Sequence, residues 1–444
     1  MIVLGRIAAF LVVLGINVLI HELGHFVAAK LMKIRVEVFS FGFGKRLFGR
    51  RIGQTDFRVS LVPVGGYVRL AGEEDFDPAH PKPDEFSSKN RAQKIFTLIL
   101  GPIMNLLLAV VLIAAINMTG VEIESYKLDK PLIGYVEKNS PADMAGLQKG
   151  DMILSINQRA IPNWKELEIV IGTNPKENLQ IDFSRKRSRQ TTHLIVDSVS
   201  RYELGYAGIY WDLPAEVETI AENYPAQKAG LAKGDRILAV DHRSVGNYFE
   251  LKDIILGAAD QKLLFTVERD RKQLEFPIVP RKEGGGGVIG FNVHIATSTY
   301  RYGFGESLQR SVKESVRLTL LTFHAFEKML KGKLSPKNLS GPIEIAKFSQ
   351  QALVSGLSNF FMLIAFISLQ LGIVNLFPVP GLDGGHLLIF VIEAIIRRDL
   401  NSKLKAILIY AGFALLITLM VFVILNDIAK TLPRGWGSIF PFLN

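Results

Sequence analysis

The chain opens with MIVLGRIAAFLVVLGINVLIHELGHFVAAK, residues 1–30, and this stretch decides the fold. Its first part is mostly apolar and long enough for a helix across about 30 Å of hydrocarbon. His21, Glu22 and His25 follow directly. No small-residue cleavage site follows the apolar run, so we expect a retained transmembrane helix and not a signal peptide. Ionisable side chains cost about 2.5–3.5 kcal/mol each within a span, so this cluster needs a partner or a function.

Three further stretches are apolar enough to cross a bilayer. They cover about 95–118, 360–377 with an extension toward 396, and 406–425. Lys and Arg are dense in 31–94 and in 397–405, and by the positive-inside tendency both loops are cytoplasmic. Both chain termini and the long segment 120–359 are therefore expected on the other side of the membrane.

The composition narrows the class of protein. The chain has 444 residues, 52 Lys and Arg against 42 Asp and Glu, a formal net charge of +10, and no cysteine. Nucleic acid and a membrane surface could both attract this charge. Because many basic residues flank the apolar runs, we favour the lipid bilayer and predict no nucleic-acid partner. Without cysteine the chain has no disulfide and no thiolate metal site.

One pattern occurs twice between the second and third spans. NSPADMAGLQKGDMILSIN, residues 139–157, and NYPAQKAGLAKGDRILAVD, residues 223–241, align without gaps. Each predicts a short helix, a Gly-Leu exit, a turn and a strand, in the order typical of PDZ domains. PDZ domains accept an extended peptide as an added strand beside a glycine-containing loop, although two small spacers or gates without a ligand remain the alternative. The candidate peptide loops contain Gly205, Gly208, Ile209, Gly290 and Phe291.

Two other segments have recognisable patterns. Residues 36–70 alternate apolar and polar side chains between glycines, which predicts a small sheet or β-hairpin at the cytoplasmic face of the membrane. Residues 303–333 place apolar groups at helical spacing opposite Lys and Arg. This pattern suits an amphipathic helix on the outer leaflet or a core-facing helix of a soluble domain.

The HELGH motif can form half of a metal site. On a helix, His21 and His25 lie on one face, so both imidazoles can meet one metal with Glu22 beside them. Neutral imidazole suits zinc, and a catalytic zinc typically has three protein ligands and a water. A third ligand is therefore expected elsewhere in the membrane.

NLFPVPGLDGGH, residues 375–386, offers that ligand. Its prolines and glycines break the third apolar stretch, and a broken helix is tolerated in a membrane only inside protein or beside a wet cavity. Asp383 lies in the break and could complete a His, His, Asp site. The alternative for Asp383 is a helix cap, and we interpret His386 as a supporting residue. The other histidines have no partner at ligand spacing: His80, His193, His242, His294 and His324.

In combination these motifs resemble the site-2 protease family of intramembrane zinc metalloproteases. The matches are HExxH in the first span, N-x-x-P-x-P-x-L-D-G in the third and G-P-x-x-N in the second. The two PDZ patterns make the chain similar to the bacterial regulator of sigma-E protease (RseP) type. The matching residues outside HELGH are Gly101, Pro102, Asn105, Asn375, Pro378, Pro380, Leu382, Asp383 and Gly384.

The resemblance implies a function for each motif. His21, His25 and Asp383 would bind one Zn²⁺ per chain, and Glu22 would be the general base. Residues of the hairpin and the broken helix would hold an unwound substrate: Val59, Leu61, Gly65, Gly66, Tyr67, Asn375, Pro378 and Pro380. Gly101, Pro102, Asn105 and His386 would support the site. The implied substrates are an anti-sigma factor already shortened by another protease and remnant signal peptides, with the PDZ pair selecting substrates by size.

We therefore expect a multi-pass α-helical membrane protein with four transmembrane helices, a membrane-associated β-hairpin and two inserted α+β PDZ domains. The expected divisions are 1–30, 31–94, 95–119, 120–213, 214–295, 296–357, 358–396 and 397–444. Two other classes compete with this interpretation. A membrane-anchored PDZ scaffold would not need an intact set of metal ligands. A transporter would use the intramembrane His and carboxylate as a cation path, but the repeated segments are soluble and not membrane halves.

Overall fold

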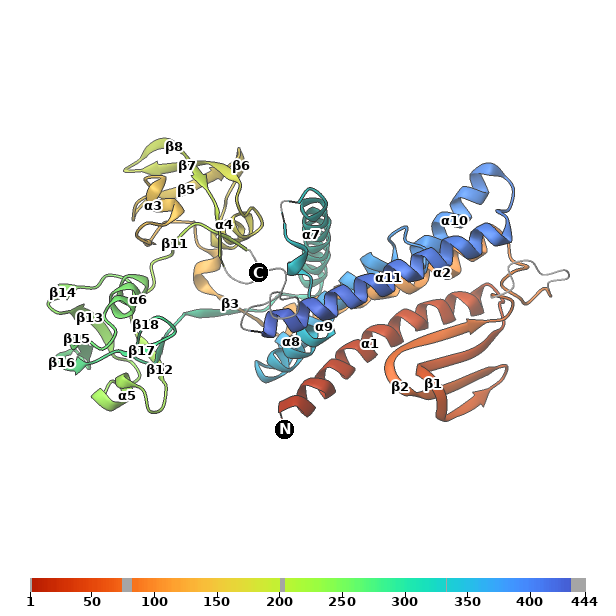
Figure 1. Ribbon diagram of the computed structural model, residues 1–444, viewed down its shortest axis with the longest axis horizontal. Coiled ribbons are helices and arrows are strands. Elements are labelled where there is room, and N and C mark those ends of the chain that lie inside the picture. Colours follow the sequence, from red (N-terminus) through yellow and green to blue (C-terminus); the bar gives the residue numbers. More distant parts are fainter. Residues whose placement is uncertain (1, 74–81, 200–203, 333, 433–444) are drawn as a thin grey trace. The chain divides into compact units, whose positions relative to one another are not determined.

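The computed structural model describes residues 2–73, 82–199, 204–332 and 334–432. It divides into two compact units (Figure 1). The first contains 1–121, 300–331 and 336–444, and the second contains 122–299 with 332–335. His80 and the tail expected after the fourth span, 433–444, lie outside the described residues.

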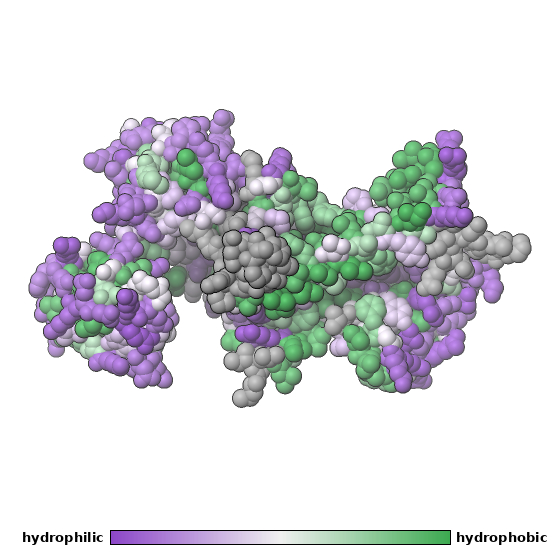
Figure 2. Space-filling model, in the orientation of Figure 1, coloured by the Kyte–Doolittle hydropathy of each residue, from purple (hydrophilic) through white to green (hydrophobic). Residues whose placement is uncertain are grey.

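Four helices in the described part of the first unit are long and apolar enough to cross a membrane. They are α1 (Ile2–Leu31), α2 (Arg91–Thr119), α9 (Leu357–Asn375) and α11 (Ser402–Thr431). Asn90 begins α2 with a capping box, because its side chain accepts from Gln93 N–H while the Gln93 side chain accepts from Asn90 N–H. Apolar surface covers these helices in Figure 2, as expected where lipid is the surrounding.

The predicted hairpin is formed by β1 (Val36–Ile52) and β2 (Thr55–Leu70). Residues 55–60 of β2 pair antiparallel with 46–52 of β1 across the turn, and 56–59 also pair with 38–41. Residues 66–70 pair with 36–41 on the opposite side, so the first half of β1 lies between two segments of β2. The inner half packs on α1, where Phe26 contacts the rings of Phe39 and Phe57 at centroid distances of 5.5 Å. The hairpin is therefore fixed beside the helix that carries HELGH (Figure 1).

Helix α7 (Phe304–Leu330) runs across α2 and α11 and not along them (Figure 1). Its buried face is a row of serines, Ser307, Ser311 and Ser315, while its aliphatic side chains, such as Val312 and Val316, are exposed. This arrangement is the reverse of a helix on a soluble core. The exposed apolar row fits the outer-leaflet alternative.

Helix α11 is joined to α8 (Pro342–Val354) by buried polar groups. The Asp427 carboxylate accepts hydrogen bonds from the backbone N–H groups of Gly341, Ile343 and Glu344, the first turn of α8. Lys430 Nζ pairs with Glu344 at 2.6 Å. A carboxylate at a helix N-terminus and a paired lysine satisfy groups that would be costly to bury alone.

The second unit contains two subdomains with the same order of elements. In the first, a four-stranded sheet of order β6-β5-β7-β8 carries α3 and α4, and in the second a sheet of order β14-β13-β15-β16 carries α5 and α6. Ile181 and Phe265 lie fully buried in the two cores. The four helices are α3 (Pro141–Met144), α4 (Trp164–Gly172), α5 (Pro225–Ala229) and α6 (Tyr248–Gly257).

The strands of the first subdomain are β4 (Tyr135–Val136), β5 (Met152–Ile156), β6 (Arg159–Ala160), β7 (Asn178–Arg185), β8 (Ser188–Ile195), β9 (Asp197–Val199), β10 (Leu204–Tyr206) and β11 (Ile209–Tyr210). Those of the second are β12 (Val217–Ile220), β13 (Arg236–Val240), β14 (Arg243–Ser244), β15 (Leu263–Arg269), β16 (Lys272–Ile278), β17 (Arg281–Glu283), β18 (Gly286–Val288) and β19 (Phe291–Val293). Strands β3 (Val121–Glu124) and β20 (Thr297–Tyr300) pair with each other where the chain enters and leaves the second unit.

The repeated Lys-Gly-Asp turn has a structural explanation. The Asp151 carboxylate accepts hydrogen bonds from Nε and Nη2 of Arg185, each at 2.7 Å. The Asp235 carboxylate accepts from the same two atoms of Arg269, at 2.6 and 2.7 Å. Both carboxylates are buried, and each bidentate pair joins its turn to the end of a strand in the sheet.

We expect Asp235→Ala to destabilise the second subdomain by about 3 kcal/mol, because it leaves the Arg269 guanidinium without its buried partner. Urea-dependent proteolysis of the full chain at 210–295 measures this loss. Glu283→Ala is the matched control, since it removes an exposed pair with Arg281, of the kind that contributes below about 1 kcal/mol. Equal effects of the two substitutions would contradict the explanation.

Candidate metal centre

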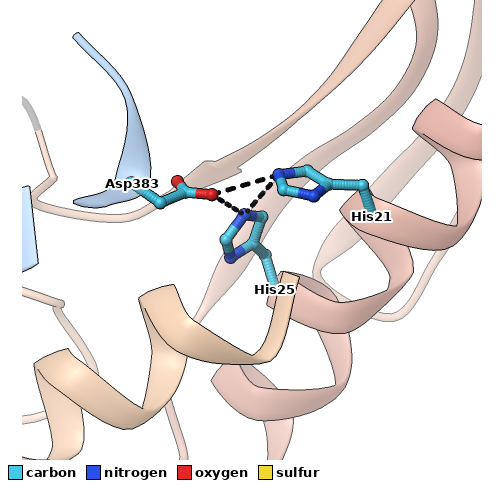
Figure 3. A group of neighbouring side chains, drawn as sticks. All are labelled: His21, His25 and Asp383. Carbon is cyan, nitrogen blue, oxygen red and sulfur yellow. Dashed lines mark hydrogen bonds and ion pairs between the residues drawn. The ribbon is translucent and has the colours of Figure 1, made fainter. Parts of the chain in front are cut away.

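The structure brings His21, His25 and Asp383 together from two helices (Figure 3). The two histidines lie one turn apart on α1, and Asp383 is the first residue of α10 (Asp383–Ile396). His21 Nε2 lies 3.2 Å from His25 Nε2 and 3.2 Å from Asp383 Oδ2. His25 Nε2 lies 3.5 Å from the same Asp383 oxygen. Three ligand atoms thus converge on one point.

These distances fit a zinc ion. Tetrahedral zinc with bonds of about 2.0–2.1 Å separates its ligand atoms by about 3.3 Å, close to the observed triangle. The Asp383 Oδ2 atom is buried and has no hydrogen-bond donor among the described residues, as a ligand oxygen requires. Two imidazoles and a carboxylate are also a donor set that zinc accepts.

The broken helix places Asp383 at this point. Helix α9 ends at Asn375, and α10 begins only at Asp383. Gly381 has a φ of +97°, which a residue with a side chain rarely adopts. The cap alternative for Asp383 is not what the structure has, because Leu382 occupies the N-cap position and the Asp383 carboxylate points to the histidines. Pro378 and Pro380 lie within the break, and Phe377 packs on Phe326 of α7.

Two glycines let α1 and α2 approach closely. A side chain at Gly24 would overlap the backbone of Leu100 and Gly101, and one at Gly101 would overlap the His25 imidazole. The Gly of HELGH and the Gly of the GPxxN motif therefore share one helix crossing. Pro102 follows Gly101 inside α2 and is buried with it.

We expect Gly101→Ala to weaken zinc binding strongly, since its methyl group would displace the Nε2 atom of His25. Zinc content of the purified chain by atomic absorption measures the effect. Gly305→Ala is the control, because that helical glycine has open space around it. Full zinc content in the Gly101 variant would show that the helices can separate without cost to the site.

The other ring nitrogen of each histidine also has a neighbour. His25 Nδ1 lies 2.9 Å from the backbone oxygen of Thr97. His21 Nδ1 lies 3.3 Å from the side-chain amide of Asn105, which is fully buried on α2. The Asn375 amide lies 3.4 Å from His21 Nε2, so this residue adjoins the three side chains.

Strand β2 passes directly beside Glu22. A Cβ at Gly66 would lie 3.5 Å from Glu22 Cγ, and the backbone of Val68 hydrogen bonds to the Glu22 carboxyl group. Of the predicted hairpin residues, the structure therefore brings Gly66 and its neighbour Tyr67 to the site. Val59, Leu61 and Gly65 lie farther back along the same strand.

A polar cavity of about 880 Å³ opens beside Asp383. His386 and Tyr67 line it close to the site, and Glu393 and Lys405, paired at 2.6 Å, line it farther along α10 and α11. A broken intramembrane helix is tolerated inside protein or beside a cavity that can hold water, and this polar cavity lies beside the break.

The predicted peptide loops have matching backbones in both subdomains. Gly208 and Gly290 have φ values of +73° and +81°, and a Cβ at either would overlap the preceding helix start, at Ser140 and Tyr224 respectively. Gly205 lies in β10 and Ile209 begins β11. In the second subdomain, Gly290 and Phe291 line a cavity of about 450 Å³ against α6.

The comparisons with known proteins agree with this geometry. The family model for Peptidase family M50 matches residues 9–419. The chain belongs to peptidase family M50. The resemblance to site-2 proteases is thereby confirmed, and the chain is a zinc metalloprotease as predicted.

Relatives match over nearly the whole length. The regulator of sigma E protease of Haemophilus influenzae is 33% identical over 448 residues, covering 96% of this chain and 99% of the relative. The regulator of sigma-E protease RseP of Escherichia coli is 29% identical over 460 residues, with the same coverage. A PDZ domain of an SdrC-like protein from Listeria monocytogenes is 18% identical and covers 18% of this chain and 85% of its own, with a TM-score of 0.17. At that TM-score the likeness does not establish a fold.

Sequence reasoning missed two backbone contacts of the site. The Thr97 carbonyl that orients His25 and the Val68 backbone that meets Glu22 use groups present in every residue. No residue pattern could have indicated them, since they depend on how α2 and β2 pack on α1.

Proposed function

We propose that this M50 protease hydrolyses peptide bonds within the transmembrane segments of single-span membrane proteins. The observation that carries the proposal is the convergence of His21, His25 and Asp383 inside the helical unit, with Glu22 beside them. The site adjoins a polar cavity and lies on helices apolar enough to cross a membrane. A substrate at this depth is itself a membrane segment.

His21, His25 and Asp383 would hold one zinc ion, which supplies Lewis-acid activation of water and of the scissile carbonyl group when bound. Glu22 takes the proton of the attacking water and gives it to the leaving amine nitrogen. Val68 and Gly66 of β2 hold the Glu22 carboxyl group in place. The Asn375 amide donates a hydrogen bond to the carbonyl oxygen on which negative charge develops.

A helical substrate has its backbone groups paired, so it must unwind before cleavage. Residues 56–59 of β2 pair on both sides, with 38–41 and with 48–51 of β1, whereas 66–70 pair on one side only, with 36–41. The other side of 66–70 has no strand partner among the described residues. We propose that this edge binds the unwound segment as an added strand, with Gly66 and Tyr67 along it and Leu61 and Gly65 before it. Val59 pairs with both Phe41 and Phe48, so its backbone is not free to pair with a substrate. Pro378 and Pro380 would line the other side of the segment.

We further propose that both subdomains of the second unit are PDZ domains that lie in the periplasm with both termini, while 31–94 and 397–405 are cytoplasmic. The pair would admit substrates whose outer part another protease has shortened. The relatives are named regulators of sigma E, which supports a role in a sigma-E pathway. The resemblance to this type extends the proposal to an anti-sigma factor and remnant signal peptides as substrates in the inner membrane.

We expect deletion of 131–281 to relax selection by size, so that long and shortened forms of one substrate are cleaved at similar rates. The metal centre belongs to the other compact unit, so the deletion should leave zinc content unchanged. Gel-based cleavage of the paired substrates measures the ratio of rates. If the deleted chain still prefers the shortened form as strongly, the filter proposal is wrong.

A single experiment separates a protease from a transporter with the same metal site. The chain is reconstituted in vesicles with a tagged single-span substrate, with and without a zinc-chelating hydroxamate. Hydroxamate-sensitive cleavage supports the proposal. Zinc flux across the vesicle membrane with an intact substrate would favour the transporter.

A further inference from the structure

We infer that Asn105 is a positioning residue whose side-chain oxygen accepts the Nδ1 proton of His21 and so keeps the Nε2 lone pair available to the metal. The inference rests on the proposed metal centre. It concerns a contact between α2 and α1 outside the three ligands.

The tautomer of neutral His25 follows from the neighbour of its Nδ1 atom. Its Nδ1 faces the backbone oxygen of Thr97 at 2.9 Å, and a carbonyl oxygen can only accept. The proton of neutral His25 is therefore on Nδ1, and Nε2 carries a lone pair. That lone pair points to the atoms of His21 and Asp383 with which it shares the site.

His21 must have the same tautomer to act as a ligand. Its Nε2 lies 3.2 Å from both His25 Nε2 and Asp383 Oδ2, so a proton on Nε2 would fill the position of the metal. The proton then belongs on Nδ1, where the group within reach is the Asn105 side chain at 3.3 Å. An N–H at Nδ1 requires an acceptor there.

The Asn105 amide meets this requirement in only one orientation. Its nitrogen and oxygen have nearly the same shape, and a half-turn of the amide exchanges them without moving other atoms. With the nitrogen toward Nδ1, His21 would carry its proton on Nε2 and could not bind zinc through that atom. With the oxygen toward Nδ1, both histidines present lone pairs to one point. The structure has Nδ2 toward His21 Nδ1 and leaves Oδ1 without a partner among the described residues, so the half-turn that brings Oδ1 to Nδ1 breaks no other hydrogen bond of the amide.

The surroundings of Asn105 suit a fixed acceptor. The residue is fully buried, and its backbone oxygen accepts a hydrogen bond of 2.9 Å from Ser368 Oγ on α9. The close approach at Gly24 and Gly101 fixes α2 against α1 one turn away. Water is therefore a poor substitute when the side chain is removed, and loss of such an orienting partner typically weakens metal binding about 10- to 100-fold.

Zinc affinity of the full chain in detergent, by competition with a chromophoric chelator, tests the inference. Asn105→Leu is expected to weaken zinc binding about 10- to 100-fold, whereas Asn105→Asp, which keeps an acceptor oxygen, should stay within about threefold of the parent. Ser368→Ala is the matched control, because it removes a hydrogen bond to Asn105 without touching the contact with His21. Parent affinity in Asn105→Leu, or equal losses in the Leu and Asp variants, would overturn the inference.

A measurement on the unmutated chain covers the case in which Asn105→Leu fails to fold. With ¹⁵N-labelled histidine and bound zinc, the His21 proton should be on Nδ1, with the signal assigned by its loss in His21→Gln. A proton on Nε2 contradicts the inference while the zinc site stands. A parent chain that binds no zinc fails the proposed metal centre itself, so the two failures are distinguishable.

Discussion

Replacing Glu22 by glutamine is expected to lower substrate cleavage about 1000-fold or more while zinc stays bound. Glutamine keeps the size of the side chain and can still meet the backbone of Val68, but it cannot take a proton from water. The ligand atoms of His21, His25 and Asp383 are untouched by this change. Cleavage of a tagged single-span substrate and zinc content, measured on the same preparation, provide the two readouts.

Glu37→Gln is the control for this substitution. Glu37 begins the same hairpin that passes Glu22, but its carboxylate pairs with Arg35 and Arg69. Its loss should leave the rate within about threefold, as expected for a half-exposed ion pair. Appreciable turnover by Glu22→Gln would remove the residue from the role of general base.

Replacing Asp383 by alanine is expected to abolish both zinc binding and cleavage. Two histidines remain, yet the oxygen that lies 3.2 and 3.5 Å from their Nε2 atoms is lost. Zinc affinity should fall more than about 100-fold, because even partners outside the ligand set contribute 10- to 100-fold. Chelator competition and atomic absorption measure the loss.

Asp399→Ala provides a matched comparison for Asp383. Asp399 lines the same cavity, but it pairs with Arg91 and does not approach the histidines. We expect normal zinc content in that variant. Unchanged zinc content in Asp383→Ala would exclude Asp383 as a ligand and leave the third position of the site open.

The proposed ligands could be predicted from the sequence because local rules determine where they lie. HELGH puts His21 and His25 on one helical face. The prolines and glycines around Asp383 indicate a break in an apolar helix. The length of each apolar run likewise predicts the transmembrane helices, because that signal is also local in the sequence. In each case the residues that carry the signal are neighbours along the chain.

The remaining features depend on packing between distant segments. The sequence predicts strands over 36–70, but it does not show that 38–41 pair with both 56–59 and 66–69. Asn105 could be associated with the site only by resemblance, since its contact with His21 requires the helix crossing at Gly24 and Gly101.

The end of the last span illustrates the same limit. Apolar length predicts a helix over about 406–425, yet α11 continues to Thr431. From the sequence, Asp427 and Lys430 indicate residues outside the membrane. In the structure, the first turn of α8 hydrogen bonds to Asp427 and pairs with Lys430. Buried charges are compatible with a helix end when the partner segment supplies their hydrogen bonds.

The central claim is that zinc held by His21, His25 and Asp383 supports peptide hydrolysis within a membrane segment. Mass spectrometry of the products from a purified, zinc-loaded chain and a single-span substrate tests it most directly. We expect a cut inside the apolar span of the substrate, absent in Glu22→Gln and blocked by a zinc-chelating hydroxamate. An intact substrate with zinc fully bound, or a cut only outside the span, would contradict it.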